Sequence, residues 1–484
     1  IRNVEDARAV LRAGADKISV NTPALERPAL ITELAEAFGV QCVVVGIDSV
    51  READGEWRVR SHTGSPDAMR APGKRTLDWI EEAQRLGAGE RLLTLFGRRD
   101  ESTGAIVVTA VFQPPGGSLA VLRARAQAGE HYPALTASHP SAQIHERELW
   151  EQTGLQPFGH PWLKPVRFEG ERQQRMAEYP FFKVRGQEVH EVGVGPIHAG
   201  VIEPGHFRFM CLGEKVHHLE IQLGYQHRGV EKLLLQRPPM SLTPIVESIC
   251  GDSCIAYAWG YLAALEALTG ASPSFETEVL RGVALEMERI AIHVATLNGL
   301  ATDIAFLQGT GTYGRLRTAV INASQRVSGN RFGRGWLRPW RTKGLNEALR
   351  QDVRQTLTDF ARDLAGMNDL MCSALSVKAR FKGIGVVSTQ AARDLGLLGV
   401  AGRASGVAQD TRSQLPGRLY ERLPLEMQVE ASGDCWARMV VRMREIDASL
   451  AWLFRVLDDE TLDLKGDADT PIVLDARLRP EALC

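Results

Sequence analysis

The amino-acid sequence has little net charge, no long apolar run and few cysteines, and each shortage excludes a class of protein. It holds 57 Lys and Arg against 59 Asp and Glu among 484 residues, and the formal net charge of −2 gives no electrostatic case for a nucleic-acid partner. No apolar run approaches the roughly 18 residues that a membrane-spanning helix needs. The longest runs, such as residues 105–112, suit buried strands.

The seven cysteines are odd in number and widely scattered, and no signal peptide precedes them. This usage predicts a reducing cytoplasm and argues against a disulfide framework. The chain starts at Ile1 without a methionine and stops at Cys484 soon after a strand-like stretch, so we expect a fragment. The length predicts two to four domains.

Groups that can bind a metal or move a proton concentrate in residues 194–254, which hold five of the twelve histidines and three of the seven cysteines. His198, Glu203 and His206 follow a glycine-rich turn in a stretch that predicts a short hairpin. Two histidines this close, with a glutamate between them, favour a proton-handling site, although a single histidine is usually a satisfied core or surface residue.

Two cysteines precede a long apolar helix that we expect from about residue 254. Cys250 and Cys254 would lie one turn apart on one face if both were helical, as in a soft-metal site. Simple burial is the alternative, because cysteine is among the most buried residue types. Upstream, Arg228, Glu231 and Lys232 stand at one-turn spacing at a helix start.

Later segments have helical periodicity. In residues 280–306, Glu286, Arg289 and His293 share one helix face at i, i+3 and i+7, and charged groups on so apolar a helix predict pairing inside a core. Amphipathic stripes around residues 345–376 and 434–456 predict bundle helices.

The first ninety residues alternate helix and strand, and the strand-like residues 91–95 follow them. This alternation predicts parallel βα units. In such units ligand groups sit just past the carboxyl ends of the strands. Asn21 and Thr22 occupy that position after one strand, and Asp48 occupies it after the next.

Residues 1–22, 42–49 and 87–94 closely resemble the cyclase subunit of imidazole glycerol phosphate synthase, a (β/α)8 barrel of histidine biosynthesis. The resemblance implies a catalytic role for Asp48, a substrate-binding strand end at Asn21 and Thr22, and a place near the ammonia entrance for Lys17. The strands that carry the second catalytic aspartate would lie before Ile1. We therefore expect a partial barrel, a lyase remnant without cyclase activity.

After the barrel-like stretch, two strands at 103–112 and 118–126 flank a proline- and glycine-rich turn, and a helix follows with Pro140 in its first turn. We place the seam with the barrel fragment near residues 86–97.

The predicted helix carries three consecutive charges, Glu146, Arg147 and Glu148, which predict a solvated face or, alternatively, a subunit contact. Residues 145–155 and 159–165 resemble the 30 kDa-type subunit of respiratory complex I and its relatives in membrane-bound hydrogenases. That resemblance implies assembly rather than chemistry.

A second resemblance covers most of the chain. Eight ordered stretches look like the large subunit of group 4 [NiFe] hydrogenases of the formate hydrogenlyase or hydrogenase-4 type, which is related to the 49 kDa quinone-site subunit of complex I. In that group the 30 kDa-like and 49 kDa-like modules are fused in this order. The stretches are residues 195–209, 224–234, 247–254, 285–306, 329–339, 380–389, 402–412 and 431–449.

The resemblance implies a cavity lined by His198, His206, Arg228, Glu247 and Asp252. It also implies a nickel–iron site, which needs two Cys-x-x-Cys pairs because four thiolates hold the metals.

The first Cys-x-x-Cys pair is only partly present, and Cys250 and Cys254 are its candidate metal ligands. Ser248 replaces the expected arginine and Ser253 replaces the second cysteine, so Cys254 comes one residue late, turned by about 100° on a helix. The second pair would lie beyond Cys484.

The quinone branch of the family fits in part. His206 falls near the quinone histidine of that branch, and Ser248 stands where a tyrosine is expected. In either branch the resemblance implies a 4Fe-4S cluster in a small partner subunit, together with ferredoxin-like and membrane antiporter-like subunits. It implies a cytoplasmic protein, peripheral on the inner face of the cell membrane.

Together these patterns predict a multidomain chain. It has a partial (β/α)8 barrel in residues 1–90, a small α+β module in 91–180, and a mainly α domain with an N-terminal β region in 185–484. The leading hypothesis is a subunit of a membrane-associated energy-converting oxidoreductase, hydrogenase-like or NADH-quinone oxidoreductase-like. The alternatives are a non-redox structural or coupling subunit and the histidine-biosynthesis cyclase. Because a cyclase-like segment precedes a hydrogenase-like one, the sequence also suggests a chimera.

Overall fold

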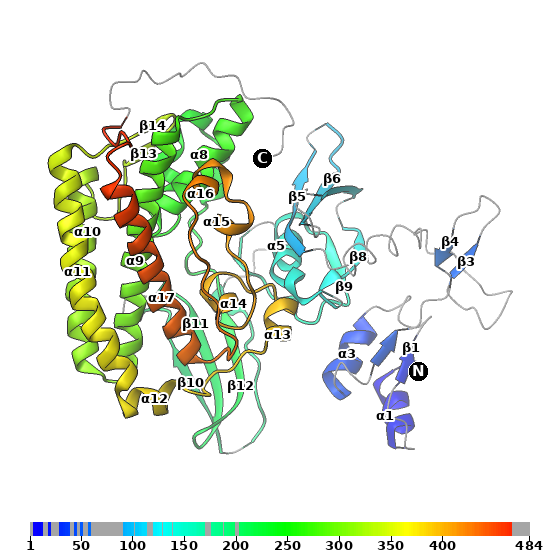
Figure 1. Ribbon diagram of the computed structural model, residues 1–484. Coiled ribbons are helices and arrows are strands. Elements are labelled where there is room, and N and C mark those ends of the chain that lie inside the picture. The colour runs from blue at the N-terminus through cyan, green and yellow to red at the C-terminus, as the bar shows by residue number, and fades with distance from the viewer. Residues whose placement is uncertain are drawn as a thin grey trace. The chain divides into compact units, whose positions relative to one another are not determined.

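The chain divides into two compact units. The first contains residues 1–198, 203–226 and 394–396, and the second contains 199–202, 227–393 and 397–484. The computed structural model, drawn in Figure 1, describes residues 3–12, 18–20, 29–38, 43–45, 49–51, 57–59, 91–100, 102–113, 120–127, 129–137, 139–169, 176–186, 188–198 and 203–466.

The N-terminal segment alternates helix and strand as predicted. Helices α1 (Val4–Arg12) and α3 (Ala29–Phe38) pack through Ala7, Leu30 and Leu34, which are fully buried. Strands β1 (Ile18–Val20) and β2 (Val43–Val45) pair in parallel. A short antiparallel pair follows, β3 (Ser49–Arg51) with β4 (Trp57–Val59). The predicted barrel-site residues Lys17, Asn21, Thr22 and Asp48 lie outside the described residues.

The next strand does not continue the parallel series. Strand β5 (Arg91–Arg99) pairs antiparallel with β6 (Ile106–Gln113), which pairs antiparallel with β7 (Ala120–Ala126). The prediction of residues 91–95 as a barrel strand is therefore wrong. The connection from β5 to β6 is a short turn, and a short turn suits an antiparallel hairpin, whereas a parallel pair needs a long crossover.

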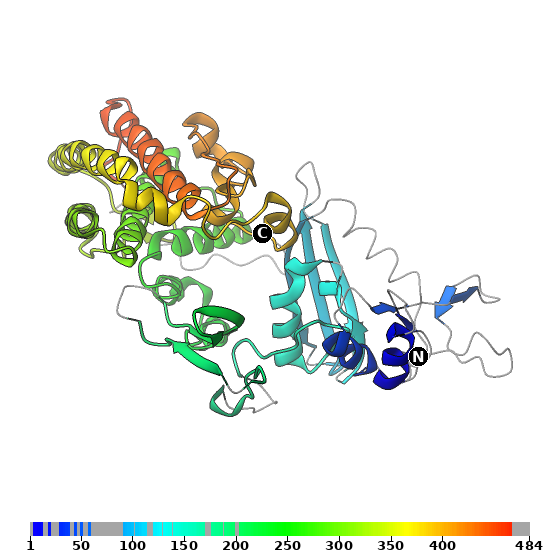
Figure 2. The same ribbon diagram turned by 90° about the horizontal axis from the view of Figure 1, so that it is seen from below.

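Helix α5 (Gln143–Thr153) covers this sheet, and Figure 2 shows it alongside the strands. It continues from a 3₁₀ turn at Pro140–Ala142, so the predicted position of Pro140 in the first turn is confirmed. The apolar core between helix and sheet contains Leu95, Ile106 and Leu149.

The predicted solvated face of this helix is wrong for two of its three charges. Glu146 and Arg147 are buried, with 0% and 2% of their surface exposed. The Glu146 carboxylate accepts the backbone N–H groups of Leu135 at 2.8 Å and Thr136 at 2.9 Å, and Arg147 Nε donates to the carbonyl of Lys164 at 2.6 Å. The charged side chains are buried because they satisfy backbone groups that no secondary structure pairs.

A second buried pair joins the loop after α5 to the next sheet. Lys164 Nζ donates to Glu220 Oε1 at 2.6 Å, with both side chains buried, and lies 4.9 Å and 4.8 Å from the ring centroids of Tyr179 and Phe181. Short strands β8 (His131–Pro133) and β9 (Gln156–Phe158) pair in parallel.

Three antiparallel strands complete the first unit: β10 (Val189–Val194), β11 (His206–Leu212) and β12 (Lys215–Gln222). The predicted hairpin in this region is therefore confirmed. The sheet belongs to the same compact unit as the β5–β7 sheet, whereas the helices that follow it form the second unit.

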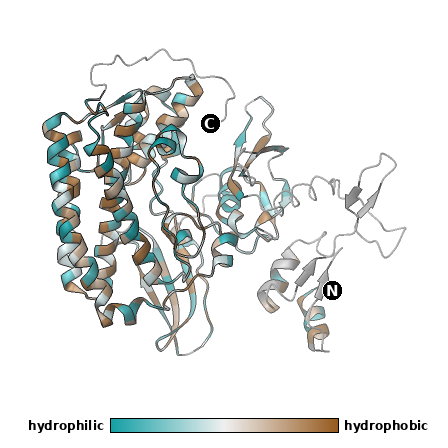
Figure 3. Cartoon of the chain, viewed as in Figure 1, coloured by the Kyte–Doolittle hydropathy of each residue, from teal (hydrophilic) through white to brown (hydrophobic). Residues whose placement is uncertain are grey.

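Long helices form the core of the second unit, and the colours of Figure 3 show that apolar and hydrophilic residues are interspersed along them. Side-chain oxygens cap three of them: Ser274 accepts from the Thr277 N–H, and Asn346 and Asp434 act in the same way. No helix within the described ranges combines the length and apolarity that crossing a bilayer requires. The long helices are α8 (Cys254–Thr269), α9 (Phe275–Asp303), α10 (Leu307–Ser328), α11 (Glu347–Ser373) and α17 (Cys435–Asp458).

Short elements connect the long helices. They are α6 (Val230–Leu235), α7 (Thr243–Val246), β13 (Leu337–Arg338), β14 (Arg341–Thr342), α12 (Leu375–Phe381), α13 (Thr389–Asp394), α14 (Gly399–Arg403), α15 (Thr411–Gln414) and α16 (Gly417–Arg422).

The predicted internal pairing of charges on α9 is confirmed. Glu286, fully buried, accepts Arg412 Nη1 at 2.9 Å on both oxygens and lies 3.5 Å from Arg289 Nε. His293 Nε2 lies 2.6 Å from Glu445 on α17, whose other oxygen accepts Arg403 Nε at 2.6 Å. Burial lowers the pKa of His293 to about 4, so its ring is neutral.

A separate buried pair joins α8 to α9 and supplies a stability test. Arg281 donates to both oxygens of Glu266 at 2.9 and 2.6 Å, and both residues are at most 4% exposed. Glu266→Leu leaves the guanidinium buried and unpaired, so we expect a loss of about 3–5 kcal/mol in the free energy of unfolding. Adding Arg281→Met should restore most of it, because two apolar side chains replace the pair.

Urea unfolding of the whole chain, followed by far-ultraviolet circular dichroism, measures this effect. Asp363→Asn is the control, because the exposed pair of Arg315 with Asp363 should contribute less than about 1 kcal/mol. A loss for Glu266→Leu no larger than for the control would contradict the buried-pair argument.

Candidate functional site

The turn between α7 and α8 is anchored by a buried glutamate. Glu247 is 3% exposed, and its Oε1 accepts Arg338 Nη1 at 2.6 Å and the Gly335 N–H at 2.8 Å. Arg228, exposed ahead of α6, donates through Nη2 to the carbonyls of Ser248 and Ile249, both at 2.7 Å. Two predicted site residues therefore hold the backbone of this turn in place.

The two cysteines of the turn are not on one helix face. Cys254 is the first residue of α8 and is fully buried, with Sγ 3.8 Å from the carbonyl oxygen of Gly251. Cys250 lies in the preceding turn, with Sγ 3.7 Å from Asp252 Oδ1. The prediction that the two thiols lie one helical turn apart on one face is therefore wrong, because α8 starts too late to include Cys250.

These thiols do not fit a nickel–iron centre. Burial raises the pKa of the Cys254 thiol, and a metal binds the thiolate rather than the thiol. Across the ranges that the structure describes, no three His, Cys, Asp or Glu side chains gather into a possible ligand set.

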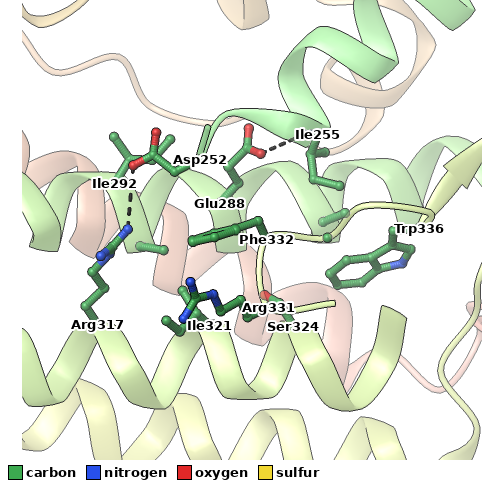
Figure 4. Close-up of a pocket in the computed structure, with 13 residues that line it drawn as sticks. Asp252, Ile255, Glu288, Ile292, Arg317, Ile321, Ser324, Arg331, Phe332 and Trp336 are labelled. Atoms are coloured by element: carbon green, nitrogen blue, oxygen red, sulfur yellow. Dashed lines mark hydrogen bonds and ion pairs between the residues drawn. The ribbon is translucent and has the colours of Figure 1, made fainter. Parts of the chain in front are cut away.

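A small cavity lies beside the turn, and its polar lining consists mainly of two carboxylates and two guanidinium groups (Figure 4). Its volume of about 20 Å³ suits a single water molecule. It lies among the start of α8, the middle of α9 and α10, and the loop before β13. The lining residues that Figure 4 labels are Asp252, Ile255, Glu288, Ile292, Arg317, Ile321, Ser324, Arg331, Phe332 and Trp336.

Glu288 is the most perturbed acid of the cavity. It is 8% exposed, and its carboxylate accepts the N–H groups of Ile255 at 2.6 Å and Ala256 at 3.0 Å. These donors are among the free N–H groups of the first turn of α8. Burial, together with a smaller effect of the charge of Asp252, raises the pKa of Glu288 to about 8 against these hydrogen bonds.

The other charged groups of the cavity are partly paired. Arg317 lies 3.6 Å from Asp252, and Arg331 lies over the Phe332 ring at 4.7 Å. The arrangement can hold a proton on Glu288 near neutral pH and exchange it through one water molecule.

Glu288 was not among the candidate site residues that the sequence indicated, since it lies on the same apolar helix as the paired charges Glu286 and Arg289. The sequence did contain an indication, because Glu286 and Glu288 are two residues apart and such residues do not share a helix face. Glu288 therefore could not join Glu286 in the same network, and a separate partner was to be expected.

The two predicted histidines belong to the first compact unit, so they are described apart from the turn. His198 Nε2 lies 2.9 Å from the Gly205 carbonyl, and His206 Nδ1 lies 3.1 Å from the Gly195 carbonyl. His206 also meets the Phe181 ring at 5.7 Å between centroids. Both rings thus bind backbone carbonyls on the two sides of the connection between β10 and β11.

Comparison with known proteins finds two family matches in different parts of the chain. Residues 303–469 match the family model of the 49 Kd subunit of respiratory-chain NADH dehydrogenase. Residues 1–104 match the model of the histidine biosynthesis protein family. The first match spans α10 to α17, and the second overlaps β5, which the structure places in the antiparallel sheet.

Curated relatives cover the N-terminal segment. This segment is 74% identical over 93 residues to the imidazole glycerol phosphate synthase subunit HisF of Xylella fastidiosa (strain M12). It is 72% identical to that of Xanthomonas campestris pv. campestris (strain B100) and 71% to that of Xanthomonas axonopodis pv. citri (strain 306). Each match covers 19% of this chain and 36% of the relative, so the chain spans about a third of their length.

The resemblances to the cyclase subunit and to the 49 kDa subunit are therefore confirmed: the chain joins a HisF-like segment to a segment like the 49 Kd subunit. The 49 Kd match connects the second segment with the subunits of an oxidoreductase complex.

The raised pKa of Glu288 predicts a pH dependence of stability. The folded chain holds this proton up to about pH 8, whereas the unfolded chain releases it near 4.5, so Glu288 makes stability fall as pH rises between these values. Glu288→Gln should remove this fall. Relative to the parent, the free energy of unfolding of the variant should therefore rise by a few kcal/mol between about pH 5 and pH 8, because each pKa unit is worth about 1.4 kcal/mol.

Urea unfolding of both proteins at several pH values between about 5 and 8 measures the difference, with the exposed Glu421→Gln as control. If the difference in unfolding free energy between Glu288→Gln and the parent stayed constant with pH, the raised pKa of Glu288 would be contradicted.

Proposed function

We propose that this chain is a subunit of an energy-converting oxidoreductase complex and moves protons at the cavity beside the Glu247–Cys254 turn. The observation that carries the proposal is the meeting of Asp252 and Glu288 at one water-sized cavity. The match of residues 303–469 to the 49 Kd subunit supports the class of complex.

The proton route uses the chain's own side chains. The Cys250 thiol lies 3.7 Å from Asp252, which lines the cavity together with Glu288. A water molecule in the cavity would connect the two carboxyl groups. A carboxyl group that titrates near neutral pH accepts and releases protons readily, which is what general acid–base chemistry needs.

Electrons would come from outside the chain in this proposal. A 4Fe-4S cluster in a small partner subunit would deliver them, and a quinone or protons would accept them near the turn. Ferredoxin-like and membrane antiporter-like subunits would complete the complex, and the chain would lie peripherally on the cytoplasmic face of the membrane.

The test compares variants in the complex assembled with its partners. Asp252→Asn and Glu288→Gln should each lower turnover by about 10²–10⁴-fold, because each removes a proton-carrying group. Asp363→Asn should leave turnover unchanged, since this exposed carboxylate pairs with Arg315 away from the cavity. The measurements are quinone-linked turnover, hydrogen-linked turnover and the metal content of each complex. Full activity in both cavity variants would overturn the proposal.

A second candidate is a non-redox structural or coupling subunit. Ser248 and Ser253 favour it, since they stand at positions where the related enzymes place reactive groups. A complex that assembles normally, contains no nickel and shows neither quinone-linked nor hydrogen-linked turnover would support this candidate instead.

The HisF-like segment favours a third candidate, cyclisation in histidine biosynthesis. We infer a remnant without turnover, because β5 pairs antiparallel with β6 and does not extend a parallel barrel. Ammonia-dependent cyclisation by the purified chain tests this inference, and measurable product would overturn it.

A further inference from the structure

A cationic stretch interrupts the nearly neutral charge balance of the chain. Between Asp369 and Asp394 the sequence carries Lys378, Arg380, Lys382 and Arg393 and neither Asp nor Glu. The stretch contains α12 and the loop that follows it.

Helix α12 exposes aliphatic and cationic side chains on one face. Val377 and Phe381 are buried, which fixes the orientation of this short helix. Leu375 is 81% exposed, and Arg380 is exposed as well. The face directed toward solvent is thus amphipathic.

The following loop also exposes apolar side chains, although its backbone is firmly held. Ile384 and Val386 are 52% and 59% exposed. Beneath them, the Ile384 carbonyl accepts the Cys435 N–H at 2.9 Å, and Arg438 donates to the Gly385 carbonyl at 3.0 Å. Gly383 and Gly385 have φ of 71° and 64°, a backbone conformation that favours glycine. The loop is therefore built to present these side chains.

The cations of this stretch are not neutralised by the chain itself. On α10, exposed arginines pair with carboxylates, as Arg315 does with Asp363 at 2.7 Å and Arg326 with Asp352 at 2.5 Å. Within the described ranges, Lys378, Arg380 and Arg393 have no such ion pair, and Lys382 lies over the Trp436 ring at 4.8 Å. The stretch therefore offers its charge to an external anion.

We propose that this basic–apolar patch, defined as Leu375, Lys378, Arg380, Lys382, Ile384 and Val386, docks the chain on the anionic surface of a phospholipid bilayer. Aliphatic side chains would enter the interface while the long cationic side chains reach phosphate groups. Among the exposed side chains of residues 375–388 none is acidic, and two of the cations are lysines, a residue type that protein–protein interfaces contain less often than other surfaces. The proposal depends on this patch alone and not on redox activity.

Vesicle co-sedimentation of the full chain tests the proposal, with phosphatidylcholine vesicles that contain or lack phosphatidylglycerol. The chain should bind the anionic vesicles, and salt should weaken binding. The triple variant K378Q/R380Q/K382Q should lose on the order of 100-fold in affinity, because each cation near an anionic surface contributes roughly fivefold. Ile384→Ser with Val386→Ser should weaken binding but keep the salt dependence.

A matched control removes the same charge elsewhere. R315Q/R326Q/R354Q takes three cations from exposed ion pairs on α10 and α11, and it should bind like the parent chain. Thermal melting verifies that each variant is folded. Equal binding to neutral vesicles, or equal losses in both triple variants, would overturn the proposal. Capture of the chain by polyglutamate but not by anionic vesicles would instead indicate an acidic protein partner and would also overturn it.

Discussion

Neutralisation of charge inside the second unit is the constraint on which its architecture depends. Three carboxylates and three guanidinium groups meet between α9 and α17, and an ionised group buried without a partner would cost several kcal/mol. Burial alone would raise the pKa of Glu445, but the hydrogen bonds from His293 and Arg403 outweigh it and lower the pKa to about 2. Glu445 therefore remains ionised. These pairs hold α14 through Arg403 and α15 through Arg412. The groups are Glu286, Asp410, Glu445, Arg289, Arg403 and Arg412.

Helical periodicity predicted much of this unit, but it could not identify the partners across the bundle. The shared face of Glu286, Arg289 and His293 follows from spacing alone, and so does the conclusion that they are paired. Arg412 lies 126 residues after Glu286, and Glu445 lies 152 residues after His293. Contacts over such distances depend on how the helices pack, which local patterns do not contain.

Predictions failed where a segment's fold depended on its neighbours. Residues 91–95 have a strand pattern that suits either a barrel or a hairpin, and the choice depends on the nearby β6. Glu146 and Arg147 look like surface charges until the loop that ends at Lys164 supplies carbonyl groups for one of them. Glu288 likewise has a role only because α8 begins beside it with free N–H groups.

Arg289 lies between the two halves of the buried network, 3.5 Å from Glu286 and 3.6 Å from Glu445. One cation therefore serves two acids on different helices. Substitutions at these acids would be epistatic, since the loss of one changes the field that the other experiences through the same guanidinium. A replacement for Arg289 would therefore have to suit an acid on α9 and an acid on α17 at the same time.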